Sequence, residues 1–163
     1  MKKAFFPIFI DISDKKVYVI GGGKIEARRM KSLSSFAEDI TVISPEICAQ
    51  FEPLIAEKKI TWVQKAYQPG MLKDADIVLA ATDDPETNRQ VEEETKRLEK
   101  EEKRQILFNR ADKKENCDFY FPSLVQTEDV VIGINSGGSS PATVKEMRKV
   151  IEKTLHMTKV TKE

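Results

Sequence analysis

The chain has 163 residues, which fits one domain, or one domain with a small appendage, and is enough to bury a substantial core. Its 27 Lys plus Arg side chains balance 27 Asp plus Glu side chains, which argues against nucleic-acid binding driven by excess positive charge. A hydrophobic content of 40% excludes a disordered chain, and no apolar run approaches the roughly 20 residues that cross a bilayer, so we expect no membrane contact.

The cysteine and histidine content argues against a metal centre. Cys48 and Cys117 lie far apart, and His156 is the only histidine, whereas a structural zinc site needs about four such ligands. We therefore predict no resident metal. A disulfide between the two cysteines is not excluded, but a chain of this size does not need one. We expect reduced thiols in a cytoplasmic protein. His156, alone in the last predicted helix, fits a surface or cavity-lining position better than an iron or proton site.

The first apolar run follows two lysines and covers residues 4–10, before Asp11 ends it. A signal peptide would need a small-residue cleavage site after the run, and none follows. We predict a strand here instead.

Strands and helices then alternate. Short apolar runs predict strands over 17–20, 40–43, 60–63, 77–81 and 106–108. Helices are predicted after the glycines at 21–23, over 46–57, and from the cap Asp84 with Pro85 in its first turn. Near-continuous apolar strands between helices predict an α/β fold, a Rossmann-like doubly wound parallel sheet over residues 1–112.

Residues 113–163 have a different pattern. Two strands over 119–125 and 130–135 precede a loop at 136–140, and Ser140 with Pro141 can begin a last helix. We predict a small α+β segment here.

The three glycines Gly21, Gly22 and Gly23 follow a buried strand and open a helix, which is the context of a dinucleotide fingerprint. Glycine lets the backbone approach a pyrophosphate at the positive helix end, and we include Lys24 and Ile25 of the first turn in this site. The third fingerprint position, usually Gly or Ala, is Glu26. A plain strand-to-helix turn is the alternative, but it does not need three consecutive glycines.

The ends of two further strands complete the predicted cofactor site. Ser44, Pro45 and Glu46 end the second strand, where an acidic residue can bind a ribose hydroxyl, although Glu46 can equally favour its own helix start. No Arg stands there to receive a 2′-phosphate, which favours NAD over NADP. Thr82 and Asp83 end the fourth strand, and the capping role of Asp84 leaves both free to face a ligand.

Two other segments are candidates for the chemistry. Asn109, Arg110 and Asp112 follow the fifth strand at the same edge of the sheet, where a carboxylate can act as a general base, although a lone Asp is more often a loop or capping residue. The loop 136–140 offers amides and hydroxyls to an anion at a helix start, and a flexible turn explains it equally well.

These motifs, in this order, resemble one family, the precorrin-2 dehydrogenase or sirohydrochlorin ferrochelatase module found at the N-terminus of siroheme synthases. The matching stretches are Phe6–Phe9, Val19–Gly23 with Ala27–Arg29, Ala81–Pro85 with Asn88 and Arg89, Asn109 with Asp112, Cys117–Phe119 with Phe121–Ser123, and Ser136–Gly138 with Ser140–Ala142. The resemblance covers nearly the whole chain.

The resemblance implies NAD-dependent oxidation of precorrin-2 to sirohydrochlorin, and in some members the insertion of ferrous iron. It assigns catalysis to Asp112 and tetrapyrrole binding to the loop Ser136, Gly137 and Gly138, and we add Asn109 and Arg110 to the substrate site. It also implies a cytoplasmic homodimer in which the segment after the Rossmann unit is exchanged between subunits.

Two departures from the family pattern bear on function. Arg110 stands where relatives have apolar residues, and it can either lower the pKa of Asp112 or meet a substrate carboxylate. Longer members add a helical domain beyond the position of Glu163, so we predict dehydrogenation and leave iron insertion open. The alternatives are a non-catalytic nucleotide-sensing domain and a tetrapyrrole carrier without turnover.

Overall fold

The computed structural model describes residues 5–160, and the side chains only as far as residue 155. The prediction for His156 therefore lies outside the described side chains. The chain divides into two compact units, the first ending at Phe119 and the second beginning at Tyr120.

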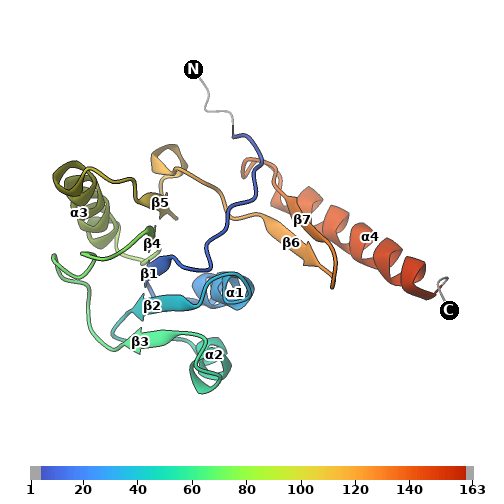
Figure 1. Ribbon diagram of the computed structural model, residues 1–163, viewed down its shortest axis with the longest axis horizontal. Coiled ribbons are helices and arrows are strands. Elements are labelled where there is room, and N and C mark those ends of the chain that lie inside the picture. The colour runs from blue at the N-terminus through green and yellow to red at the C-terminus, as the bar shows by residue number, and fades with distance from the viewer. Residues whose placement is uncertain (1–4, 161–163) are drawn as a thin grey trace. The chain divides into compact units, whose positions relative to one another are not determined.

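The first unit is built on a five-stranded parallel sheet (Figure 1). Its strands are β1 (Lys16–Ile20), β2 (Asp39–Ile43), β3 (Thr61–Val63), β4 (Ile77–Ala80) and β5 (Leu107–Arg110), in the order β3-β2-β1-β4-β5. Helices α1 (Lys24–Leu33) and α2 (Glu52–Ala56) lie on one side of the sheet, and α3 (Pro85–Glu102) lies on the other. The predicted Rossmann-like, doubly wound α/β fold is confirmed.

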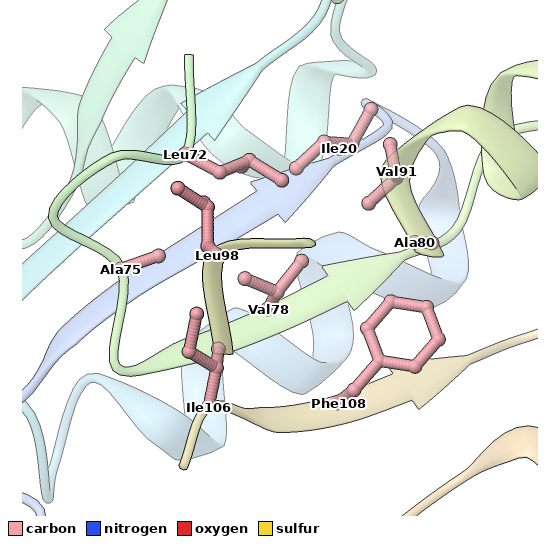
Figure 2. Packing of buried hydrophobic residues seen from close by; sticks show 9 residues of the cluster. All are labelled: Ile20, Leu72, Ala75, Val78, Ala80, Val91, Leu98, Ile106 and Phe108. Atoms are coloured by element: carbon pink, nitrogen blue, oxygen red, sulfur yellow. The ribbon is translucent and has the colours of Figure 1, made fainter. Parts of the chain in front are cut away.

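Strand register distributes the apolar residues between the two faces. Ile20 pairs with Ala80 and Val19 with Leu79, and successive side chains of a strand point to opposite faces. The core on the α3 side, drawn in Figure 2, comprises Ile20, Leu72, Ala75, Val78, Ala80, Val91, Leu98, Ile106 and Phe108. Both faces of the central strands are thus buried, which explains why these strands are continuous apolar runs in the sequence.

Loops leave the sheet together at the carboxyl ends of the strands. The amide of Gly21 donates to the carbonyl of Ile43 (3.1 Å), and the amide of Ala111 donates to the carbonyl of Ala80 (2.9 Å). The strand order reverses between β1 and β4, so this edge contains the switch point where doubly wound sheets bind ligands.

The predicted start of α3 is confirmed. The side chain of Asp84 accepts hydrogen bonds from the amides of Glu86 (3.1 Å) and Thr87 (3.0 Å), and Pro85 is the first helical residue. This cap satisfies two of the amides that every helix start leaves without intrahelical partners.

Two sequence predictions were wrong in the first unit. Residues 5–10 form no strand, and Phe6 is 83% exposed, because this segment does not enter the sheet that would supply its hydrogen bonds. The helix predicted over 46–57 is only a 3-10 turn η1 (Ala49–Phe51) followed by α2. Residues 46–48 stay outside any helix because the amide of Cys48 donates to Gly22 O (2.9 Å) and Ser44 Oγ donates to Glu46 O (2.6 Å).

The second unit is an antiparallel hairpin of β6 (Ser123–Gln126) and β7 (Val131–Ile134), followed by α4 (Pro141–Val160), which contacts β6. The 3-10 turn η2 (Lys114–Asn116) precedes it, in the first unit. The first of the two predicted strands is shorter than expected, and the helix begins at Pro141 as predicted. An α+β segment therefore follows the sheet, as expected.

Candidate functional site

An open cleft of about 610 Å³ lies at the carboxyl edge of the parallel sheet. The residues predicted to bind the cofactor that line it are Gly21, Gly22, Gly23, Ser44, Pro45, Glu46, Thr82 and Asp83. Three loops separated widely in sequence thus meet at one cavity. Lys24 and Ile25 follow in the exposed first turn of α1, outside the lining. Tyr67, which sequence reasoning did not single out, also lines the cleft, and its hydroxyl donates to the Glu94 carboxylate.

The glycine turn brings three loops closer than any side chain allows. Gly21 has φ of 130°, and a Cβ atom there would lie 2.3 Å from the carbonyl oxygen of Ala81. A Cβ atom on Gly22 would lie 2.1 Å from the carbonyl oxygen of Glu46. The first two glycines are therefore needed to pack the loops together. At Gly23 the Cβ would meet the Oε2 atom of Glu26 at 3.1 Å.

The two helices that begin at this edge start differently. Asp84 caps α3 with its carboxylate, whereas Gly23, the N-cap of α1, brings no side chain to its helix. An uncapped helix start with its positive dipole end at a glycine cradle matches a diphosphate in charge and space. The residues of this cleft therefore fit a dinucleotide.

The end of β2 is held by its own hydrogen bonds. The buried Ser44 donates its hydroxyl to Glu46 O, and its carbonyl accepts from the indole nitrogen of Trp62 (2.9 Å). The exposed Glu46 lines the cleft from this loop. The acidic residue thus stands at the strand end, where the sequence predicted a ribose contact.

Asn88, on the inner face of α3, connects the cleft to the predicted catalytic residue. It is fully buried, and its Oδ1 accepts from both the amide (3.0 Å) and the hydroxyl (2.9 Å) of Thr82. Its Nδ2 donates to Thr82 O (3.0 Å) and to Oδ1 of Asp112 (3.2 Å). The sequence offered one signal for this role, a polar residue one turn into a helix that packs on the sheet.

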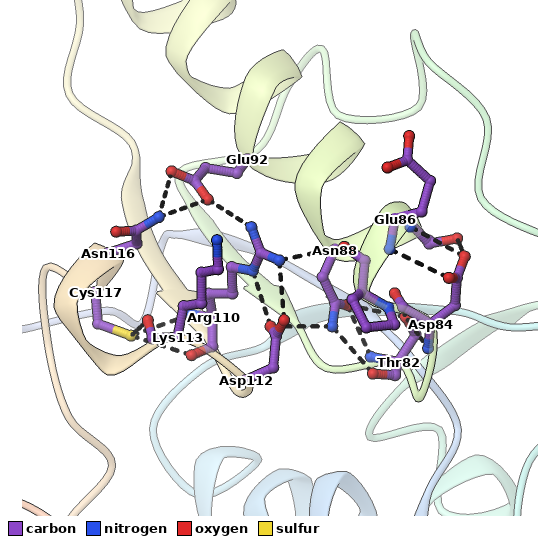
Figure 3. A network of polar contacts seen from close by, with 12 residues as sticks. Thr82, Asp84, Glu86, Asn88, Glu92, Arg110, Asp112, Lys113, Asn116 and Cys117 are labelled. Atoms are coloured by element: carbon purple, nitrogen blue, oxygen red, sulfur yellow. Dashed lines mark hydrogen bonds and ion pairs between the residues drawn. The ribbon is translucent and has the colours of Figure 1, made fainter.

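Asp112 is held by Arg110 in a two-pronged ion pair (Figure 3). The guanidinium donates from Nε to Oδ1 (2.8 Å) and from Nη2 to Oδ2 (2.9 Å) of the carboxylate. This hydrogen bonding lowers the pKa of Asp112, against the opposing effect of burial and with help from Asn88. The Asp112 side chain remains 31% exposed. It is thus an oriented carboxylate with access to solvent.

Arg110 itself is enclosed. It is 3% exposed, its Nη1 donates to Glu92 Oε2 (2.8 Å), and its Nη2 also donates to the carbonyl of Pro85 (3.2 Å). Burial lowers the pKa of the guanidinium, but its bond to Asp112 outweighs this and the net effect is a raised pKa. Of the two roles left open for Arg110, the contacts match the one toward Asp112.

Glu92 completes the network on the far side of Arg110. The Nδ2 of Asn116 donates to both its carboxylate oxygens at 2.9 Å, and Lys96 pairs with it one turn along α3. Burial would raise the pKa of Glu92, but the hydrogen bonds from Lys96, Asn116 and Arg110 lower it to about 2. Glu92 is therefore the second anion that holds the buried guanidinium.

The remaining predicted residues lie elsewhere. The buried Asn109 donates its amide nitrogen to the carbonyl of Phe119 (2.8 Å), which fastens the chain after η2 to β5. Ser136, Gly137 and Gly138 belong to the second unit, where the Ser136 hydroxyl accepts from the amide of Ser140 (3.1 Å). Both glycines have positive φ, 63° and 73°, so this loop requires them.

Cys48 and Cys117 are both free thiols, as expected. Cys117 is buried against the backbone of Arg110, whose amide donates to its sulfur at 3.2 Å. Among the residues that the structure describes, no group of His, Cys, Asp and Glu is arranged to hold a metal ion. In the same part of the chain, no helix is long and apolar enough to cross a membrane.

Comparison with known proteins defines the class. The family model described as "Putative NAD(P)-binding" matches residues 8–123, so the chain belongs to this NAD(P)-binding family. The glycine cradle and the uncapped start of α1 lie within the matched region.

Two curated relatives and one solved structure are similar to this chain and have more specific descriptions than the family model. The chain is 34% identical to siroheme synthase of Blochmanniella pennsylvanica over 148 residues, which cover 91% of this chain and 30% of that protein. It is 34% identical to siroheme synthase of Nitrosospira multiformis over 157 residues, which cover 94% of this chain and 32% of that protein. The chain thus spans about a third of the length of these relatives. The structure of SirC, a precorrin-2 dehydrogenase, has the same fold, with a TM-score of 0.73 at 21% identity over 92% of this chain and 71% of that one.

Proposed function

We propose that the chain oxidises precorrin-2 to sirohydrochlorin, with NAD as the hydride acceptor. The observation that carries this proposal is the chain of hydrogen bonds from Thr82 through Asn88 to Asp112, which fixes an ionised carboxylate relative to the dinucleotide cleft. The siroheme synthases and the SirC dehydrogenase among the similar proteins support this substrate class.

The protein's contribution is to hold two reactants and accept a proton. Bound NAD would supply a hydride acceptor, and the oxidation would also release one proton from the substrate. The three glycines and the start of α1 would hold the diphosphate, Glu46 would bind a ribose hydroxyl, and Thr82 with Asp83 would line the site beside β4. Asp112 accepts the proton: Arg110 keeps it ionised, and its exposed edge passes the proton to water. Holding both partners in register lowers the entropic part of the barrier.

Substrate recognition requires groups that meet carboxylates, because precorrin-2 carries eight of them. The loop Ser136–Gly138 is our candidate, since it precedes the start of α4 and its two glycines leave backbone without side chains there. Within the first unit, Asn109 holds the chain after η2 through Phe119, and Arg110 orients the Asp112 carboxylate and bonds to Glu92.

We also propose a homodimer. Large apolar side chains are exposed in both units, and such groups commonly mark protein interfaces. Among the described residues they are Phe6, Ile8, Phe9, Ile10 and Ile25 in the first unit, and Val130, Met147 and Val150 in the second. Light scattering on the purified chain should give twice the 18.5 kDa monomer mass; a monomer at micromolar concentration would contradict this.

The test of the function is an anaerobic reaction of the purified chain with precorrin-2, with and without NAD, followed by absorbance. Equal amounts of sirohydrochlorin and NADH should appear only with NAD. Addition of ferrous iron afterwards tests metal insertion, for which iron is the substrate. NAD binding without turnover would favour the sensing domain, and tetrapyrrole binding without NAD binding would favour the carrier.

A further inference from the structure

A buried carboxylate stands in the dinucleotide cleft, where a Rossmann fingerprint has Gly or Ala. Glu26, in the first turn of α1, is 5% exposed and lines the cleft together with the three glycines. Its Oε2 lies 3.1 Å from the position of a Cβ on Gly23. The side chain is therefore folded toward the helix start that we assign to the diphosphate.

The charges around Glu26 neutralise it poorly. The nearest cation is Arg29 on the same helix, whose Nη1 lies 3.4 Å from Oε1, a long contact for a charged pair. Arg28 of α1 faces it from farther away, and Asp83 of the β4–α3 loop adds a second negative charge. Burial is the largest effect and raises the pKa of Glu26. A hydrogen bond from its own backbone amide, Arg29 and Arg28 oppose this rise, and Asp83 reinforces it.

A bound dinucleotide would add negative charge close to the Glu26 carboxylate. Its diphosphate carries two negative charges and would share the positive end of α1 with the Glu26 carboxylate. Two anions at one helix start repel each other, and the repulsion is strong where water is excluded. A neutral carboxylic acid at the same position removes the repulsion.

We propose that Glu26 couples dinucleotide binding to the uptake of one proton, so that its carboxyl group is neutral in the complex. This inference rests on the cleft being the dinucleotide site of the proposed function. Affinity is then highest below the pKa of Glu26 in the free protein and falls as the pH rises toward its higher pKa in the complex. Each unit between the two pKa values weakens binding about tenfold.

The test is isothermal titration calorimetry of the full chain with NADH between pH 5.5 and 8.5, in buffer pairs of different ionisation enthalpy. The wild type should take up a proton on binding NADH within this range, and should bind at least about tenfold more weakly at its upper end. Glu26→Gln should take up none and keep the tighter binding throughout. Glu38→Gln, an exposed carboxylate in the α1–β2 connection, is the matched control and should behave as the wild type.

The outcomes separate the two proposals. Binding without proton uptake by the wild type overturns the role of Glu26, and needs no variant that might misfold. Uptake that persists in Glu26→Gln also overturns it, because the proton then enters at another group. Absence of NADH binding by the wild type at every pH would overturn the dinucleotide site itself.

Discussion

The same edge of the sheet holds two carboxylates with opposite electrostatics. Glu26 is almost completely buried, with its own backbone amide and a long contact to Arg29 as stabilising partners, and its pKa is raised because burial outweighs them. Asp112 is a third exposed and bound by both arms of Arg110, and its pKa is lowered. Each acid has an arginine within three residues, so proximity in sequence does not distinguish them.

The geometry of the ion pair makes the difference. Arg110 is anchored by Glu92 and the carbonyl of Pro85, which leaves its remaining edge parallel to the Asp112 carboxylate. Arg29 is three residues along α1 from Glu26, and its Nη1 lies 3.4 Å from Oε1. A two-pronged guanidinium stabilises an anion more than a single long contact does, so one acid stays ionised and the other is poised to take up a proton.

The largest effect is expected from Asp112→Asn, which removes the proton acceptor but preserves the shape of the side chain. Turnover of precorrin-2 should fall by about 10²–10⁴-fold, the usual range for a general base, while NADH affinity stays unchanged. Stopped-flow absorbance and calorimetry measure the two quantities. Asp14→Asn, at an exposed site before β1, is the control. Turnover near the wild-type rate would remove Asp112 from the mechanism.

Arg110→Gln tests the contrast between Asp112 and Glu26 by removing the guanidinium that keeps Asp112 ionised. It leaves Glu92 buried without its guanidinium, and breaking a buried ion pair commonly costs about 3–5 kcal/mol, measurable by urea unfolding. The pKa of Asp112 should rise, so the acid limb of the rate profile moves to higher pH. A carboxyl group whose pKa is lowered by folding stabilises the folded state fully above its unfolded pKa, and this contribution is lost as the pH falls through the folded pKa. The part of the stability difference between wild type and Arg110→Gln that is due to Asp112 should therefore shrink in the acidic range.

If the fold tolerates Arg110→Gln, a second variant separates the effect of Arg110 on stability from its effect on the rate profile. Glu92→Gln together with Arg110→Gln removes both buried charges, and should recover part of the lost stability without restoring the rate profile. Full recovery of the rate profile by the double variant would show that Arg110 acts on the fold alone.

Gly22→Ala tests the glycine turn of the dinucleotide cleft. The added Cβ would lie 2.1 Å from Glu46 O, which is backbone and cannot move without shifting the β2 loop. We expect a loss of about 1–3 kcal/mol in unfolding free energy, typical of overpacking, and weaker NADH binding. Gly23→Ala is the matched comparison, since its Cβ meets the flexible end of Glu26 at 3.1 Å. Equal stability of the two variants would contradict the close approach.

The smallest effect should be that of Glu26→Gln on stability. A raised pKa means that Glu26 favours the folded state fully only below its unfolded pKa, and that this contribution is lost as the pH rises through the folded value. The variant should therefore gain stability over the wild type at pH 8 but not at pH 4.5, by less than the Gly22→Ala effect. Urea unfolding at both pH values measures it, and a pH-independent difference would mean that Glu26 has the same pKa in the folded and unfolded states.

Most of the fold could be predicted from local patterns, and the failures share a cause. Strands β1 and β4 were recognisable because both faces are buried, so every residue of the run is apolar. The segment 5–10 is also apolar but does not join the sheet, and residues 46–48 are kept from a helix by contacts with Gly22 and Ser44. Sheet membership and the contact with Gly22 depend on residues that are distant in sequence.

The sequence by itself determined the glycine turn, the cap at Asp84 and the acid after β5, because each depends on neighbours within a few positions. Only the tertiary structure decided the charge environment of the two carboxylates. Asn88 and Glu92 reach Asp112 and Arg110 because α3 packs over β4 and β5, and the sheet register brings their ends to one edge. Hydrogen bonds and desolvation act over a few ångströms in space, so residues distant in sequence set which acid is ionised.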